Sequence, residues 1–140
     1  LYEDGFTTYR LLYEAEKVAL VDEQLYFYRV RPGSIVSSKK RVDERRMDEL
    51  DADIEAWEFF RDKVRSLATA STKALLRTCM GIWGDAGEDG YGPTAKKRAM
   101  DVYKSVWRAS SKTLKLEPAK WVVYGSFLLW PRLACRMILR

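Results

Sequence analysis

Two carboxylates, Glu3 and Asp4, stand together directly before a stretch whose apolar spacing predicts a helix. A carboxylate at a helix start can accept a hydrogen bond from a free backbone N–H of the first turn, which stabilises the helix by ~1 kcal/mol. The other oxygen of the same group can still face a substrate. The chain has no histidine, so a carboxylate is the natural group for acid–base work here. Capping and catalysis both stay open for Asp4.

A second candidate group lies in the loop of residues 31–35, Arg-Pro-Gly-Ser-Ile, with Arg29 just before it. An arginine fork matches the geometry of phosphate oxygens. The backbone N–H groups of the loop and the hydroxyl of Ser34 offer further donors to such an anion. The alternative is that Arg29 and Arg31 flank a hairpin and are simply solvated.

The elements that position these residues form a short mixed segment. Helically spaced apolar residues predict a helix over residues 6–17. Aromatic and β-branched residues predict two short strands over residues 17–21 and 25–30, with a turn between them. The apolar face of the helix is expected to comprise Phe6, Tyr9, Leu12 or Tyr13, and Val18.

From about residue 42 the pattern is helical throughout. It predicts one helix ending near Ser66, a second ending at the glycine-rich loop of residues 84–92, a third opened by Pro93 and a fourth opened by Pro118. Pro131 is expected to kink the fourth helix, because proline removes a backbone donor and clashes with the preceding turn. The inward faces are expected to be Met47, Leu50, Ile54, Trp57 and Val64; Ala68, Leu75, Cys79 and Ile82; and Ala99, Val102 and Val106.

Residues 2–38, YEDGFTTYRLLYEAEKVALVDEQLYFYRVRPGSIVSS, resemble the acceptor half of bacterial family 2 glycosyltransferases, which are inverting enzymes of the GT-A fold. The acidic pair, the helix, the VALVDE strand and the Arg-x-Gly-Ser-Ile loop keep the order and spacing of that family. The resemblance implies that Asp4 is the general base for the acceptor hydroxyl and that Glu3 orients the acceptor. It implies that Arg29, Arg31 and Ser34 bind the leaving diphosphate. At position 5 the family more commonly has an acidic residue than glycine.

The resemblance also implies a set of partners for a longer protein. These are a nucleotide sugar, a hydroxyl acceptor such as a cell-surface polysaccharide or lipid-linked glycan, and a divalent metal, Mg²⁺ or Mn²⁺. We expect the nucleotide-binding half to precede Leu1, so that residues 1–140 alone are inactive and bind no metal. An exposed sheet edge is expected to favour a homo-oligomer, and nucleic acid is not expected as a partner.

Two other acidic patterns are not expected to bind metal. Asp51 and Asp53 have the spelling of the Asp-x-Asp motif of this family, but helical spacing places them on a solvent-facing side of a helix. The loop of residues 85–90 faintly resembles a calcium loop. However, its third ligand position is Gly87, and Lys96 stands where the bidentate glutamate should be.

The net charge of +5 is unevenly distributed. Residues 1–90 carry 14 basic and 18 acidic side chains, whereas residues 91–140 carry 11 basic and 2 acidic ones. A basic C-terminal third indicates contact with anionic lipid head groups, or else a solvated basic face. Cys79 and Cys135 lie far apart without metal-like spacing, and they predict two buried thiols in a reducing, cytoplasmic compartment.

The apolar run Trp121–Trp130 is shorter than the ~20 residues that span a bilayer. With Arg132 and Arg136 beside it, segment 118–140 fits an amphipathic helix on an anionic membrane surface. The resemblance implies that this surface is the inner face of the plasma membrane. The alternative is a core helix of the bundle. In the first case residues 118–140 could be removed without unfolding the remaining helices.

These observations predict a mainly α (α+β) fold. Residues 1–40 are expected to be the acceptor-side tail of a GT-A α/β domain, with a helix and a short strand pair. Residues 41–140 are expected to form a helical subdomain of about four helices. The rival to a glycosyltransferase is a helical protein-interaction module without catalysis, in which the acidic pair serves only as a cap.

Overall fold

The computed structural model describes residues 3–27, 44–88, 90–112 and 118–138. These residues contain no strand, and the fold is mainly α. Their helices are α1 (Glu3–Glu14), α2 (Glu44–Lys63), the 3-10 helix η1 (Arg65–Leu67), α3 (Ala68–Asp85), α4 (Gly92–Ser110), α5 (Pro118–Ser126) and α6 (Pro131–Ile138).

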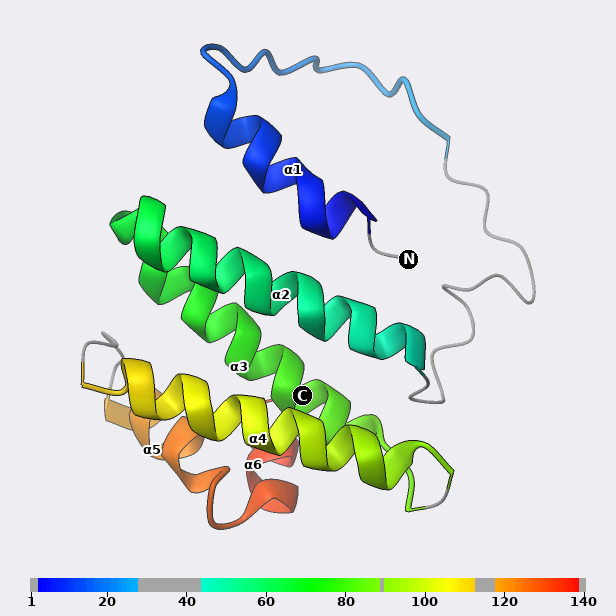
Figure 1. The fold of residues 1–140 in the computed structure, drawn as a ribbon, viewed down its shortest axis with the longest axis vertical. Helices are drawn as coiled ribbons and strands as arrows, with labels where there is room; N and C mark the ends of the chain where they lie inside the picture. Colours follow the sequence, from blue (N-terminus) through cyan, green and yellow to red (C-terminus); the bar gives the residue numbers. More distant parts are fainter. Residues whose placement is uncertain (1–2, 28–43, 89, 113–117, 139–140) are drawn as a thin grey trace.

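Helix α3 is the centre of the bundle, because α2, α4 and α6 all pack against it. Figure 1 shows α1, α2, α3 and α4 following one another across the molecule, with α5 and α6 on the side away from α1. Helices α2 and α3 run antiparallel through η1, so the start of α2 meets the end of α3. There Arg46 lies 3.7 Å from the carboxylate of Asp85.

The inner face of α2 follows the predicted helical spacing. Met47, Leu50 and Trp57 are buried, and Ile54 packs against the same core. The indole N–H of Trp57 donates to the hydroxyl of Thr72 on α3 at 2.9 Å, so the one polar atom of this buried ring has a partner. Val64, predicted on the same face, lies past the end of the helix.

The core extends from α2 to α6 as one cluster. Its aromatic centre is Phe127, which is fully buried between the rings of Tyr103 and Trp83. The Tyr103 hydroxyl donates to the backbone carbonyl of Tyr124 at 2.6 Å, which ties α4 to α5. The predicted inward faces of α3 and α4 are largely confirmed, with Tyr103 and Trp107 as additional members; Val102 is only partly buried.

Two glycines allow the tight connection between α3 and α4. Gly90 has a φ of 58°, a left-handed conformation that L side chains rarely adopt. A Cβ on Gly92 would lie 2.3 Å from the carbonyl oxygen of Gly87, so no larger residue fits there without moving the loop. Pro93 then stands in the first turn of α4, where its missing N–H costs nothing.

The prediction that Pro131 kinks a single helix was wrong, because the chain forms two helices there. From Phe127 to Leu129 each backbone N–H donates a hydrogen bond to the carbonyl three residues earlier, a tighter pattern than that of the α-helix. Pro131 then begins α6. The carbonyl of Trp130 accepts from the N–H groups of Leu133 and Ala134, both at 3.1 Å. Proline has no N–H to donate, so a first helical position suits it better than an interior one. The described part of residues 41–140 therefore has five α-helices, α2 to α6, where about four were expected.

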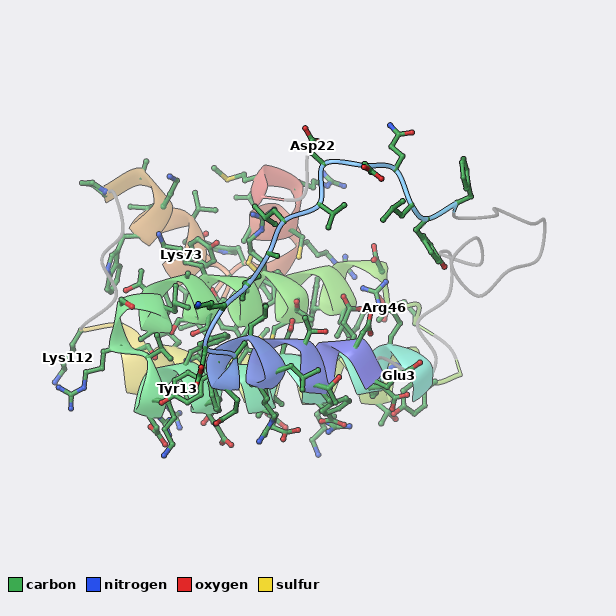
Figure 2. All side chains as sticks on the ribbon, turned by 90° about the horizontal axis from the view of Figure 1, so that it is seen from above. Glu3, Tyr13, Asp22, Arg46, Lys73 and Lys112 are labelled. Atoms are coloured by element: carbon green, nitrogen blue, oxygen red, sulfur yellow. The ribbon has the colours of Figure 1, made fainter. Side chains whose placement is uncertain are left out.

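The expected strand pair is not formed in the described residues. Residues 15–27 have no strand, and Leu20, Tyr26 and Phe27 are exposed. Figure 1 shows this segment running apart from the helices after α1, and Asp22 lies outside the bundle in Figure 2. A strand needs a neighbouring strand for its hydrogen bonds, and none is described here. Residues 28–30 and the predicted domain boundary at 40/41 lie outside the described residues.

Both cysteines are free and buried, as predicted. Burial raises the pKa of the Cys79 thiol from 9.0 to about 12 and that of Cys135 to about 11. Between the unfolded and folded pKa values the folded chain keeps a proton that the unfolded chain releases. The stability that the two buried, protonated thiols contribute is therefore fully present below about pH 9, and it is lost as the pH rises toward 12.

We expect this loss to appear in urea unfolding. Between about pH 8 and about pH 10.5, Cys79 alone should lower the free energy of unfolding by about 1–2 kcal/mol. The variant Cys79→Ala should show a smaller loss over the same range, because one titrating group is gone. An identical pH dependence in the variant and the wild type would contradict this assignment.

Candidate functional site

Helix α1 is held on the outer face of α2 by aromatic contacts, although none of its residues is buried. The ring of Tyr9 and that of Tyr13 each meet the ring of Phe59 edge-on, with centroids 5.1 Å apart in both cases. Arg10 pairs with the Glu55 carboxylate and lies over the ring of Tyr9. Offset and edge-on ring pairs contribute ~0.5–1.5 kcal/mol each beyond the area they bury, so these contacts fix the helix that carries the acidic pair.

The acidic pair lies in the first turn of α1, and both side chains are exposed. The Asp4 Oδ1 accepts a hydrogen bond from the backbone N–H of Gly5 at 2.9 Å. Asp4 was predicted to precede the helix, but α1 begins at Glu3, so Asp4 stands one residue inside it. The carboxylate still satisfies a first-turn donor. Figure 2 shows Glu3 at one end of α1 and Tyr13 toward the other.

The anion-binding part of the predicted site lies outside the described residues. Arg29, Arg31 and Ser34 all fall within residues 28–43. The grouping of these residues with Glu3 and Asp4 therefore stays a prediction from the sequence. What the structure adds is the support of the acidic pair: a helix whose position is set by Tyr9, Tyr13 and Arg10.

No protein-family model, no curated protein and no solved structure matches this chain.

Asp51 and Asp53 were predicted to face solvent, but both are half-buried. Asp51 forms an ion pair with Arg98 of α4, and Asp53 accepts a hydrogen bond of 2.6 Å from the hydroxyl of Thr78 of α3. The helical spacing placed them correctly on α2 but could not show that α3 and α4 approach that side. Their carboxylates connect helices.

Metal coordination finds no support in the part of the chain that the structure describes. No group of three His, Cys, Asp or Glu side chains there could hold a metal ion. In the loop after α3, Glu88 pairs with Lys96 at 2.5 Å. The hydrogen bond and charge of Lys96, with a weaker contribution from Arg132, hold the pKa of Glu88 below its usual value. Lys96, which stands where a calcium loop would have its bidentate glutamate, is thus the ion-pair partner of Glu88.

Tyr9 and Tyr13 were predicted on the apolar face of the helix, but their partner Phe59 and the ion pair of Arg10 with Glu55 were missed by sequence reasoning. Arg10 and Glu55 are separated by 45 positions, and no local pattern pairs them. A signal for the aromatic contact existed, since Tyr9 and Tyr13 lie one helical turn apart and Phe59 lies within α2, two residues after the inward-facing Trp57. Two apolar faces on α2 would have indicated that it is covered from both sides.

Proposed function

We propose that this chain is the acceptor-side and C-terminal part of an inverting family 2 glycosyltransferase. The observation that carries the proposal is the exposed acidic pair in the first turn of α1, on a helix fixed by aromatic contacts to α2. The sequence of residues 2–38 supplies the resemblance. On this proposal the chain comprises the tail of a GT-A catalytic domain in residues 1–40 and a helical subdomain in residues 41–140.

The chemistry requires only a carboxylate at the acceptor. Asp4 takes the proton of the acceptor hydroxyl while its oxygen attacks the anomeric carbon of the sugar, and the nucleoside diphosphate leaves from the opposite face. One displacement inverts the configuration. Glu3 binds a neighbouring hydroxyl of the acceptor and orients it. The hydroxyl needs to lose its proton only in the transition state, so an ordinary carboxylate is sufficient as the base.

On this proposal, residues other than Glu3 and Asp4 bind the leaving diphosphate and the metal. Arg29, Arg31 and Ser34 neutralise the developing charge of the diphosphate. A divalent metal, where the enzyme uses one, offsets charge on the same phosphates. The described residues offer no ligand set for it, so no step assigned to this chain runs through a metal. The expected self-association through a sheet edge has no strand among the described residues to carry it.

We expect residues 1–140 alone to bind no nucleotide sugar tightly. The nucleotide-binding strands are not among the described elements, and Asp51 and Asp53 are engaged with Arg98 and Thr78. Titration calorimetry with UDP- and dTDP-sugars in the presence of Mn²⁺ should show no heat of binding. A micromolar dissociation constant would contradict the proposal that the nucleotide sugar is bound by a part of the enzyme outside residues 1–140.

The experiment that tests the function is sugar transfer by the intact protein that contains this chain. A panel of nucleotide sugars and glycan acceptors is incubated with it, and the anomeric configuration of the product is read by NMR. The proposal predicts transfer with inversion. A product that retains the configuration of the donor would contradict a single displacement with Asp4 as the base.

A second candidate is a helical protein-interaction module. The observation that favours it is the continuous core from α2 to α6, which includes none of the described residues before Met47. In that case α1 is an accessory helix and Asp4 only satisfies the N–H of Gly5. An intact protein that transfers no sugar from any donor, but binds a protein through α2–α6, would favour this candidate.

A further inference from the structure

An apolar strip lies exposed along the turn between α5 and α6 and along α6 itself. We call Leu129, Trp130, Leu133 and Met137 the α5–α6 strip; their exposed fractions are 71%, 63%, 55% and 59%. Side chains of this size on a small helix normally turn inward, and here the inward side is already occupied. Ala134 and Cys135 face the core, and the Cys135 thiol lies 3.4 Å from the backbone carbonyl of Met80. The strip is therefore the outer side of a helix that is already packed.

The helical spacing of α6 places its exposed side chains in two parallel rows, one apolar and one cationic. Leu133 and Met137 lie one turn apart, and so do Arg132 and Arg136. At 100° per residue the apolar row and the arginine row are neighbours on the exposed side, opposite Ala134 and Cys135. Both arginines are exposed. An apolar row beside a cationic row is the pattern of helices that lie in the interface of a membrane.

The surroundings of the strip are basic. Residues 118–138 contain Lys120, Arg132 and Arg136 and no acidic residue. Two acidic side chains, one at the end of α3 and one in the loop after it, lie near α6. Glu88 is 3.8 Å from Arg132 and also pairs with Lys96, and the charge of Asp85 acts on the Cys135 thiol. Beside the strip is an open hollow of about 590 Å³, lined by Trp83, Leu129, Trp130, Pro131, Arg132 and Leu133.

We propose that the α5–α6 strip docks in the plane of an anionic lipid surface. Trp130, Leu129, Leu133 and Met137 would enter the boundary between head groups and acyl chains, while Arg132 and Arg136 contact the phosphates. Charge complementarity selects this occupant over a second copy of the chain. In a two-fold symmetric contact the same patch meets itself, which would bring two arginine rows together. The inference goes beyond the proposed function and does not depend on it.

The arrangement of the bundle agrees with this orientation. Figure 1 shows α1 on one side of α2 and α3, and α5 and α6 on the other, and α6 packs against α3 whereas α1 packs against α2. The carboxylates of Glu3 and Asp4 would therefore be on the side of the bundle away from the lipid. Among the described ranges, no helix combines the length and the apolar character needed to cross a membrane.

Vesicle flotation of the 140-residue chain tests the proposal. The chain should float with vesicles of phosphatidylcholine and phosphatidylglycerol but not with phosphatidylcholine alone. Raising the salt from about 0.1 M to about 1 M should weaken flotation, because the screening length falls from about 10 Å to about 3 Å. Arg132→Gln with Arg136→Gln should reduce vesicle binding about twenty-five-fold, since each basic residue near an anionic surface contributes about fivefold.

A second variant removes the apolar row and leaves the charges. Trp130→Ser with Leu133→Ser should reduce binding at least about tenfold, and its melting temperature should stay close to that of the wild type because both side chains are exposed. The matched controls lie elsewhere. Lys63→Gln with Arg65→Gln removes two exposed charges at the α2–α3 turn, and Leu11→Ser removes an exposed leucine of α1. Both should float like the wild type.

Several results would overturn the proposal. These are an absence of flotation, equal flotation with neutral and anionic vesicles, or an equal loss in the control variants. A dimer in sedimentation that Leu133→Ser dissociates, together with no flotation, would assign the strip to a second copy of the chain.

Discussion

Replacing Phe127 by alanine is expected to lower the free energy of unfolding by ~3–5 kcal/mol. Phe127 is fully buried, and its ring centroid lies 4.5 Å from that of Tyr103 and 5.9 Å from that of Trp83. The substitution removes apolar burial and leaves a cavity between α3, α4 and the α5–α6 turn. The surrounding helices can close such a space only in part, because packed interiors resist collapse.

Urea unfolding followed by circular dichroism measures this loss. The matched control is Leu129→Ala, which removes a large apolar side chain two residues away at an exposed position. The control should change stability by less than ~0.5 kcal/mol. If Phe127→Ala behaved like Leu129→Ala, the α5–α6 turn would not be part of the core.

This result also decides between the two roles predicted for segment 118–140. Tyr124, Phe127, Ala134 and Cys135 are buried, so the segment is part of the bundle. Its removal is expected to unfold or loosen the other helices, contrary to the surface-helix expectation. Yet its outer side carries the apolar strip. The two roles were stated as alternatives, but a helix has two sides. One side of α6 packs in the core, and the other carries exposed side chains that we propose meet lipid.

The helices of residues 44–110 could be predicted well because their apolar spacing and their end signals agree. Pro93 marks the start of α4 and the glycine-rich loop marks the end of α3. Met47, Leu50 and Trp57 repeat at helical spacing and are buried as expected. Local pattern is sufficient when the partner surface is a neighbouring helix of the same bundle.

Residues 15–27 could not be predicted in the same way. Val18, Leu20 and Val21 favour a strand by type, but a strand is stabilised by the strand beside it, and local sequence contains no information on that partner. The same holds for Arg10 and Glu55, or Asp53 and Thr78, which meet only because helices approach in space. For the candidate site, the position of Glu3 and Asp4 near a helix start was predicted, whereas the contact of Tyr9 and Tyr13 with Phe59 was missed although the apolar outer side of α2 was a signal for it.

The second large effect is expected at Asp4. If the intact protein has the proposed transferase function, Asp4→Asn should lower kcat by ~10²-fold or more, because the amide cannot take a proton from the acceptor hydroxyl. The stability should hardly change. The amide oxygen of asparagine can still accept the hydrogen bond from the backbone N–H of Gly5, which the Asp4 carboxylate accepts at 2.9 Å. The variant therefore separates the catalytic role from the capping role.

The control is Asp101→Asn, which makes the same chemical change at an exposed position on α4. It should retain the kcat of the wild type. Glu3→Gln should raise the KM for the acceptor more than it lowers kcat, since the role proposed for Glu3 is to orient the acceptor without taking its proton.

The most direct measurement is the kcat of sugar transfer by the intact enzyme with Asp4→Asn, determined beside its melting temperature. The proposal predicts a fall of ~10²-fold or more at an unchanged melting temperature. A variant that transfers sugar at close to the wild-type rate would show that Asp4 only satisfies a backbone donor of α1, and would contradict its assignment as the base.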